Sequence, residues 1–85
     1  MADVIIYSKA QCPYCDLAKN LLNQKKVSYT EIRIDLDEKE RDEMIRQSGK
    51  RTVPQIFING QSIGGYDDLA TLEKSGKLNN LLFSD

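Results

Sequence analysis

Two cysteines, Cys12 and Cys15, are the residues of this chain whose type and spacing point most directly to chemistry. They form a C-x-x-C unit that follows a short apolar run at residues 4–7 and opens a helical pattern. Residues three apart on a helix lie on the same side, and a Cα separation of roughly 5–6 Å is within disulfide range. The pair is therefore expected to alternate between a dithiol and a disulfide.

The start of the helix should make the two sulfur atoms unequal. Unpaired N–H groups and the positive end of the helix dipole favour an anion there, so the pKa of the Cys12 thiol should fall below its ordinary value. Lys9 would add positive charge, whereas Asp16 would act in the opposite direction, and the net shift stays open. Cys15 joins the inward apolar stripe of the helix and should be more buried. We expect Cys12 to attack a disulfide and Cys15 to resolve the mixed disulfide that results.

A metal site and a pair of inert core cysteines are the alternative interpretations of the C-x-x-C unit. Zinc takes four ligands, and the chain has no other cysteine and no histidine, so a metal would need a second subunit or outside thiols. Buried cysteines often act as small hydrophobic side chains, but their position at a helix start weakens that interpretation here. Because histidine is absent, any chemistry must come mainly from sulfur.

Two further segments have both a structural and a functional interpretation. Thr52-Val53-Pro54 precedes a strand, where proline is usually trans, since cis occurs in only about 5–6% of X-Pro bonds. The segment 64–68, Gly-Gly-Tyr-Asp-Asp, is typical of a strand-to-helix turn capped by Asp. A helix start there could also bind a carboxylate through backbone N–H groups, while an Asp side chain meets an ammonium. The two uses of residues 64–68 are compatible.

Four isolated side chains are open to the same two interpretations. Tyr14, between the cysteines, is either a surface aromatic residue or a flat wall for a substrate. Arg41 lies in a predicted helix and is by default solvated. Lys50 and Arg51 are by default loop charges.

Length and charge narrow the class of protein. Eighty-five residues make one domain, so residues 1–85 are predicted to share a single core. Lys plus Arg number 12 and Asp plus Glu 13, and a net charge of −1 gives no case for binding nucleic acid or an anionic membrane. No apolar run is long enough for a transmembrane helix, and Met1-Ala2-Asp3 does not begin a secretory signal. A cytoplasmic monomer is expected.

The hydrophobic pattern predicts the elements that must position these residues. The β-branched apolar run at 4–7 predicts a strand buried on both faces and therefore central in a sheet. Pro13 and the apolar residues that follow at helical spacing predict a helix over about 13–25. Residues 28–35 alternate between apolar and charged, which predicts a half-exposed edge strand.

The second half of the chain has equally local signals. Asp37 with Glu40 resembles a capping box and predicts a helix over about 37–48, with Gly49 just beyond its end. Asn59-Gly60, between apolar segments 55–58 and 61–63, predicts a β-hairpin. A helix over about 67–74 and a last amphipathic turn through residues 78–82 complete the order β-α-β-α-β-β-α-α. The first β-α-β unit should be a parallel pair with a right-handed crossover.

With these residues in place, the chain resembles a dithiol glutaredoxin of the short bacterial type over essentially all of its length. C-P-Y-C at 12–15, T-V-P at 52–54 and G-G-Y-D-D at 64–68 occur in that family's order and spacing, which is far more specific than a lone C-x-x-C. Thioredoxins proper carry W-C-G-P-C, and this chain has no tryptophan. The resemblance implies an α/β, thioredoxin-like fold. Its four-stranded mixed sheet would run in the order 28–35, 4–7, 55–58, 61–63, with helices on both faces.

The resemblance also implies where glutathione binds. Pro54 would be cis and would present the Val53 backbone to the cysteinyl part of glutathione, a one-residue strand addition. Thr52 would flank this contact, and Tyr14 would form one wall of the groove.

The two charged ends of glutathione would meet separate sets of residues. Backbone N–H groups of Tyr66 and Asp67, which follow Gly65 at the helix start, would take the γ-glutamyl carboxylate. The Asp68 side chain would take the γ-glutamyl ammonium. Many relatives have cysteine in place of Tyr66, a change that should not alter a backbone contact.

The glycine carboxylate of glutathione would lie against Lys9 and Arg41. Many relatives carry glutamine in place of Arg41, and a cation there should strengthen carboxylate binding.

The activity that the resemblance implies is glutathione-dependent thiol–disulfide exchange. The protein would reduce protein disulfides and glutathione mixed disulfides and carry electrons in cell redox homeostasis. Glutathione would be a co-substrate, with no tightly bound cofactor and no metal. The partners would be glutathionylated or disulfide-bonded proteins, with ribonucleotide reductase as one candidate, and glutathione reductase would act indirectly through glutathione.

Three alternatives remain open at this level. Some small redoxins of this kind are reduced by thioredoxin reductase, which an assay with both reductases and NADPH would reveal. Cys12 and glutathione could hold a [2Fe–2S] cluster between two subunits, although cluster-holding relatives usually have a small residue in place of Pro13; colour after anaerobic purification would show it. A redox-inert interaction module would have a Cys12 that does not react with alkylating agents at neutral pH.

Overall fold

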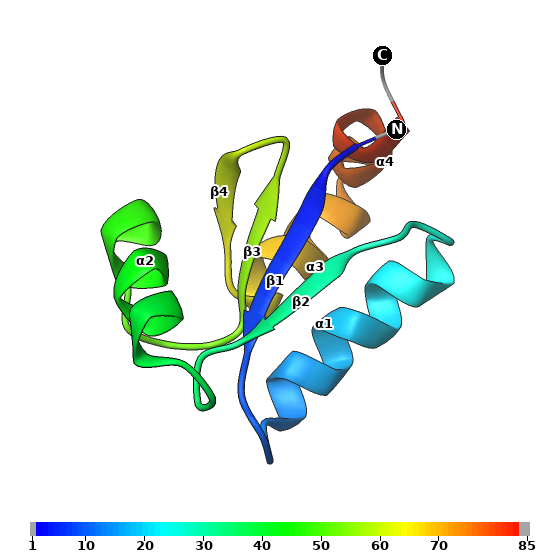
Figure 1. Cartoon of the computed structure of the whole chain (residues 1–85). Helices are drawn as coiled ribbons and strands as arrows, with labels where there is room; N and C mark the ends of the chain where they lie inside the picture. Colours follow the sequence, from blue (N-terminus) through cyan, green and yellow to red (C-terminus); the bar gives the residue numbers. More distant parts are fainter. Residues whose placement is uncertain (1, 84–85) are drawn as a thin grey trace.

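The computed structural model describes residues 2–83, which form four strands and four helices in the predicted order. The elements in chain order are β1 (Val4–Ser8), α1 (Pro13–Gln24), β2 (Thr30–Arg33), α2 (Glu38–Ser48), β3 (Gln55–Ile58), β4 (Gln61–Gly64), α3 (Tyr66–Lys74) and α4 (Lys77–Phe83). Figure 1 shows a central sheet with α2 at its left and α1, α3 and α4 toward its right.

The four strands form one mixed sheet in the order β2-β1-β3-β4, as predicted. Strand β1 pairs in parallel with β2 and antiparallel with β3, while β3 pairs antiparallel with β4. The apolar run at the N-terminus is therefore the inner strand that its composition predicts. Its carboxyl end leads directly into the loop that carries Cys12 (Figure 1).

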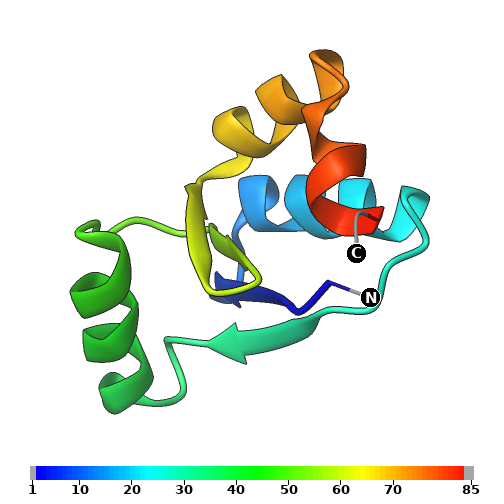
Figure 2. The ribbon, with the colours of Figure 1, turned by 90° about the horizontal axis from the view of Figure 1, so that it is seen from above.

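Side chains that alternate along β1 and β3 build two separate cores. One face carries the larger cluster, to which α1, α3 and α4 contribute: Val4, Ile6, Ala18, Leu22, Ile56, Ile58, Leu69, Leu78 and Leu82. The other face carries a smaller cluster under α2: Tyr7, Ile34, Met44 and Phe57. Figure 2 shows α2 alone on one side of the sheet and the other helices together on the opposite side. Val53 packs against the smaller cluster, so α2 helps to fix the loop before β3.

The β3–β4 connection confirms the hairpin prediction. Asn59 and Gly60 both have positive φ, 52° and 80°, as a type I′ turn requires. Gly49, also predicted, ends α2 in the left-handed conformation with φ 73°. The predicted capping box does not form: the Asp37 carboxylate accepts the Lys39 N–H at 2.9 Å, a simple N-cap bond to the second helical residue, and within residues 2–83 the Glu40 side chain makes no return bond.

Strand β2 is shorter than the predicted 28–35. Within residues 2–83 it is an edge strand paired with β1 alone, so its ladder extends from Thr30, opposite Ile5, to Arg33, opposite Ser8. Ile34 still donates its N–H to the Ser8 carbonyl at 2.9 Å and packs into the smaller core. The alternating pattern of apolar and charged residues therefore extends beyond the observed strand, which is why it predicts a strand that is too long.

Met44 is the fully buried side chain that α2 contributes to the smaller core, and its role in stability can be tested. Met44 is fully buried, and its truncation in Met44→Ala should lower the free energy of unfolding by about 2–4 kcal/mol, since little else can fill the space. Urea unfolding of the reduced protein measures this loss. Leu36→Ala, at an exposed position in the preceding loop, should stay within about 0.5 kcal/mol of the wild type. Equal midpoints for the two variants would contradict the assignment.

Candidate active site

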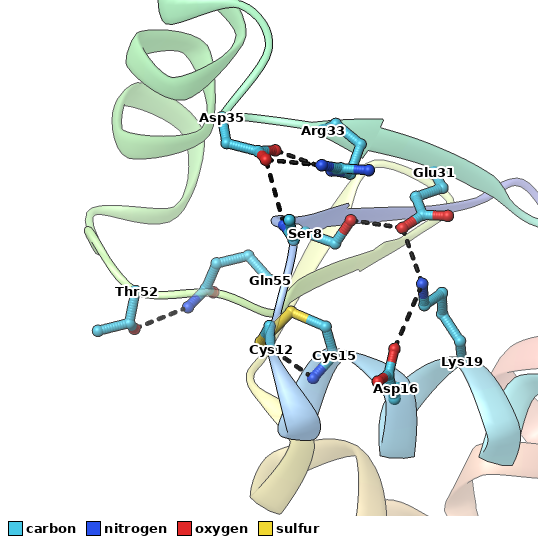
Figure 3. Close-up of a disulfide and its surroundings, with 11 residues drawn as sticks. Ser8, Cys12, Cys15, Asp16, Lys19, Glu31, Arg33, Asp35, Thr52 and Gln55 are labelled. Atoms are coloured by element: carbon cyan, nitrogen blue, oxygen red, sulfur yellow. Dashed lines mark hydrogen bonds and ion pairs between the residues drawn. A yellow bond between two sulfur atoms is a disulfide. The ribbon is translucent and has the colours of Figure 1, made fainter.

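Cys12 and Cys15 form a disulfide at the carboxyl end of the central strand. Their Cα atoms are 5.2 Å apart, within the separation expected from the sequence. Figure 3 shows the disulfide at the first turn of α1, below the end of β1. Both sulfur atoms therefore lie where a buried strand gives way to a helix start.

Cys12 is the N-cap of α1, and this position favours a negative charge on its sulfur. Its Sγ accepts a hydrogen bond from the Cys15 N–H at 3.2 Å, while Pro13 at the first helical position has no N–H of its own. In the reduced protein the same sulfur would be a thiol or thiolate, and a thiolate gains most from such a donor. Cys12 is 8% exposed and Cys15 is 1% exposed, so Cys15 is the more buried of the two, as predicted.

A hollow of about 310 Å³ extends from Tyr14 to the start of α3. It gathers eight of the side chains or backbone positions that were expected to bind glutathione: Tyr14, Thr52, Val53, Pro54, Gly65, Tyr66, Asp67 and Asp68. Tyr14 is exposed, and its ring lies 6.2 Å from that of Tyr66 at a tilt of 34°. The two aromatic rings thus stand together at one side of this first hollow.

The loop before β3 contributes open backbone to the first hollow. The Val53–Pro54 peptide bond is cis, as the resemblance implies. Thr52 and Val53 belong to no strand, and within residues 2–83 their backbone groups make none of the hydrogen bonds of turns and loops. Unpaired N–H and C=O groups of this kind can pair with an extended ligand.

The start of α3 supplies backbone N–H groups at the other side of the first hollow. Gly65 is the N-cap, and its own N–H donates to the Asp68 carboxylate at 3.0 Å. Tyr66 and Asp67 follow in the first turn, where backbone N–H groups have no partner within a helix. Gly64 is required here because its φ is 116° and a Cβ atom would collide with the Asp68 side chain.

A second hollow of about 410 Å³ adjoins the first at Thr52 and Val53. Lys9 and Arg41, both predicted to bind a carboxylate, line it together with Arg51. Within residues 2–83 none of these three cations has an ion-pair partner. The second hollow therefore combines three uncompensated positive charges.

Asp35, the acidic residue of the second hollow, carries a negative charge that is already compensated by Arg33. Its carboxylate accepts two hydrogen bonds from the Arg33 guanidinium, at 2.8 and 2.6 Å. The guanidinium is the main reason that the pKa of Asp35 lies well below its ordinary value, and the Ala10 N–H helps in the same direction. Asp35 thus adds little to cancel the charge of the nearby cations.

Besides Ile34 and Asp35 of the second hollow, three polar residues line these hollows that the sequence does not predict as binding residues. Lys50 and Arg51, by default loop charges, line the first and second hollow respectively. Gln55 is only 1% exposed; its Nε2 donates to Thr52 Oγ1 at 3.4 Å, while its Oε1 has no partner within residues 2–83. Its position could have indicated a role at the site, because Gln55 is a polar residue at the start of a buried strand and directly follows Pro54.

No helix among residues 2–83 is long and apolar enough to cross a membrane. The same part of the chain contains no group of three or more His, Cys, Asp or Glu side chains that could hold a metal ion.

The sheet order, the cysteine pair at the start of α1 and the cis proline before β3 define a thioredoxin-like thiol–disulfide oxidoreductase. The sequence profile named Glutaredoxin matches residues 4–63. The chain therefore belongs to the glutaredoxin family, and Cys12 and Cys15 make it a dithiol member.

Curated relatives and solved structures agree with this assignment. Glutaredoxin 3 of Escherichia coli K12 is 55% identical over 82 residues, covering 96% of this chain and 99% of the relative. A glutaredoxin of Pseudomonas aeruginosa is 49% identical over 82 residues, covering 96% of this chain and 98% of the relative. The solution structure of a Brucella melitensis glutaredoxin matches with a TM-score of 0.85 at 49% identity, over 96% and 89% of the two chains. A buckwheat glutaredoxin in complex with glutathione matches with a TM-score of 0.88 at 32% identity, over 95% and 76%.

The difference between the two sulfur atoms leads to a measurable difference in reactivity. In the reduced protein, iodoacetamide at neutral pH should alkylate Cys12 at least about tenfold faster than Cys15, because only Cys12 has the helix-start N–H donor and residual exposure. Mass spectrometry of the digested protein after short reaction times gives both rates. Equal rates for the two residues would contradict the geometry.

Proposed function

We propose that Cys12 is the nucleophile and Cys15 the resolving thiol of a glutathione-dependent disulfide reductase. In the one-thiol route, the Cys12 thiolate attacks the glutathione sulfur of a mixed disulfide. The S–S bond to the substrate breaks, the substrate leaves as a thiolate that takes a proton from water, and Cys12 carries the glutathione. A second glutathione thiolate then attacks that sulfur, releases Cys12 and forms oxidised glutathione.

The two-thiol route uses the proximity of Cys15. Cys12 attacks a disulfide of a protein substrate, and the Cys15 thiolate then attacks Cys12 Sγ, which releases the reduced substrate. The product is the Cys12–Cys15 disulfide found in the structure. Two glutathione molecules return it to the dithiol and are themselves oxidised.

The observation that supports glutathione as the co-substrate is the match between its charged ends and the two hollows. In the first hollow, the N–H groups of Tyr66 and Asp67 suit the γ-glutamyl carboxylate, and Asp68 suits the ammonium beside it. Asp68 uses one carboxylate oxygen for the Gly65 N–H, which leaves the other for the ligand.

The middle of glutathione would lie along the loop before β3. We assign the Val53 backbone to its cysteinyl residue, with Thr52 beside it and Pro54 below. An extended peptide placed there would form hydrogen bonds with the backbone N–H and C=O groups of this loop that have no partner within residues 2–83. Tyr14 would cover the same part of the ligand from α1 and, as the residue between the two cysteines, bring it toward Cys12.

The second hollow suits the glycine carboxylate of glutathione. Lys9 and Arg41 come from different elements, line the same space and lack other ion-pair partners within residues 2–83. Glutathione would thus extend from the start of α3, across Val53, to the cations beside α2. It is a co-substrate in this assignment, with no tightly bound cofactor.

The protein partners follow from the same chemistry. Substrates would be glutathionylated or disulfide-bonded proteins, with ribonucleotide reductase as one candidate, and glutathione reductase would act indirectly by regenerating glutathione. We treat residues 1–85 as a single glutaredoxin domain that works as a monomer. A cytoplasmic location would suit it, because a reduced glutathione pool keeps thiols reduced there.

Cysteine variants test the roles of the two thiols. With NADPH, glutathione reductase and a small glutathione mixed disulfide, Cys12→Ser should fall to the uncatalysed rate, because it removes the attacking sulfur. Cys15→Ser should keep this activity within a fewfold of the wild type but lose the reduction of a protein disulfide, because the resolving thiol is missing. A fully active Cys12→Ser protein would rule out the proposed function, and the same assay with thioredoxin reductase in place of glutathione would identify the alternative donor.

An arginine variant tests the placement of the glycine carboxylate. Arg41→Ala should weaken ground-state binding by about 0.5–1 kcal/mol, a roughly two- to fivefold rise in the Michaelis constant for glutathione, because Arg41 is partly exposed. The rise should shrink at high salt. Arg46→Ala is the matched control, since Arg46 lies on the same helix but is paired with Glu43 and lines neither hollow. An unchanged Michaelis constant for Arg41→Ala would remove this residue from the site.

A further inference from the structure

The second hollow carries more positive charge than one carboxylate of glutathione uses. Lys9, Arg41 and Arg51 all line it, and within residues 2–83 none of the three has an ion-pair partner. A carboxylate has two oxygens and is satisfied by one arginine fork, or by an arginine and a lysine. Lys9 and Arg41 are enough for the glycine carboxylate, so Arg51 stays available for a second anion.

The acidic residue at this hollow does not supply the second anion. Asp35 accepts two hydrogen bonds from the Arg33 guanidinium and a third from the Ala10 N–H, at 3.2 Å. Figure 3 shows the guanidinium and the carboxylate facing each other. Because Asp35 is paired in this way, the charge of the three cations is directed to an outside ligand.

The space in the second hollow also exceeds what glutathione would place there. Its volume is about 410 Å³, against about 310 Å³ for the first hollow. In the proposed binding mode, however, the first hollow takes the γ-glutamyl residue, and the second takes glycine, the residue with no side chain. Ile34, which is 9% exposed, lines the second hollow and adds an apolar surface beside the cations. A side chain with methylene groups and a terminal carboxylate suits this combination better than glycine alone.

The backbone between the two hollows determines which residue of a bound chain reaches the cations. Thr52 and Val53 line both hollows, and within residues 2–83 their backbone groups make none of the hydrogen bonds of turns and loops, so an extended chain can pair with them. The Cys–Gly part of glutathione is an ordinary peptide unit, and a polypeptide can therefore follow the same course. When its cysteine lies at Val53, the residue that follows the cysteine enters the second hollow.

The direction of the side chains agrees with this placement. Successive side chains of an extended chain point to opposite sides, so a cysteine that faces Cys12 sends the next side chain away from α1. Arg41 belongs to α2, and Figure 2 shows α2 on the side of the sheet opposite to α1. The side chain that follows the cysteine therefore points toward the helix that carries Arg41.

We propose that the second hollow selects disulfide-bonded proteins in which acidic residues directly follow the cysteine that Cys12 attacks. The methylene groups of the first acidic side chain would pack on Ile34, and two carboxylates would share the three cations. Glutathione, with one carboxylate at this end, would use only part of the charge. The inference rests on the proposed function, because it keeps the nucleophile and the direction of binding given above.

The affected step is the first exchange of the two-thiol route. The Cys12 thiolate attacks the sulfur of the bound cysteine, the substrate S–S bond breaks, and the other substrate cysteine leaves as a thiolate that takes a proton from water. Cys15 loses its proton to water, and its thiolate then attacks Cys12 Sγ and releases the bound cysteine as a thiolate, which is protonated in turn. The dithiol of the protein is oxidised, and the substrate disulfide is reduced by the same two electrons.

Capped peptide disulfides test the preference. The probes are the symmetric disulfides of acetyl-Ala-Cys-Glu-Glu-amide and acetyl-Ala-Cys-Gln-Gln-amide, each mixed with an excess of reduced protein. The reaction is stopped with acid, the peptide thiol is measured by chromatography, and each rate is divided by the rate with dithiothreitol to remove the intrinsic reactivity of the peptide. The Glu-Glu probe should react about fourfold faster than the Gln-Gln probe, since each exposed contact is worth roughly a factor of two. The ratio should fall toward one at about 1 M salt.

A third probe and two variants show whether the preference comes from this hollow. Acetyl-Glu-Glu-Cys-Ala-amide carries the same charge before the cysteine and should gain nothing, because Asp67 and Asp68 line the first hollow. Arg51→Gln should lower the ratio of Glu-Glu to Gln-Gln rates to about two, whereas a merely weakened fold would slow both probes alike. Arg46→Gln is the matched control and should keep the wild-type ratio, since Arg46 is paired with Glu43 and lines neither hollow.

The outcomes separate the inference from the proposed function. If the protein reduces a small glutathione mixed disulfide but treats the Glu-Glu and Gln-Gln probes alike, the inference is wrong and the proposed function stands. If acidic residues before the cysteine help as much, or if Arg46→Gln lowers the ratio as far as Arg51→Gln does, the effect is a general attraction of charge, which also overturns the inference. If the protein reduces neither the glutathione mixed disulfide nor any peptide, both fail together.

Discussion

The burial of β1 on both faces is the constraint on which the rest of the structure depends. Its short apolar run pairs with β2 on one side and β3 on the other, and its alternate side chains enter both cores. Such a strand has only one stable position, so its carboxyl end is a fixed point in space. The four-residue loop that follows must then place Cys12 at the start of α1. The position of the sulfur atoms is thus fixed by the packing of β1, several residues earlier in the chain.

The binding surface depends on this fixed point but is assembled from separate parts of the chain. The loop before β3 is held by Val53 in the smaller core, and the start of α3 follows directly from the β3–β4 hairpin. The chain as a whole is almost neutral, yet Asp67 and Asp68 line the first hollow together with Lys50, and three cations line the second. A small ligand with an ammonium at one end and only a carboxylate at the other would be oriented by this separation, even though each surface contact is weak.

Features carried by adjacent residues could be predicted from the sequence, and features made by distant ones could not. The run at 4–7, Pro13 and Asn59-Gly60 each have a local physical preference, and the strand, the helix start and the hairpin all appear as expected. The length of β2 depends on where its partner β1 ends, so the alternating sequence pattern alone predicts a strand that is too long. The cis bond at Pro54 was implied by the family resemblance and not by the residue, for which trans is the ordinary state. Arg51 and Gln55 acquire their surroundings only when the loop before β3 meets β1 and α2.

The asymmetry of the two thiols also accounts for how one pair can serve two routes. If both sulfur atoms were equally acidic, the Cys12–glutathione adduct would be resolved internally as fast as Cys15 could reach it, and the one-thiol route would seldom be completed. A buried Cys15 that loses its proton less readily than Cys12 gives a free glutathione time to attack the adduct instead. A protein substrate attached to Cys12 is different, because its bulk hinders an incoming glutathione while Cys15 is already in place, with its Cα atom 5.2 Å away. The balance between the routes is then set by access from outside and by how readily Cys15 loses its proton, so the burial of Cys15 can influence which substrates are reduced by which route.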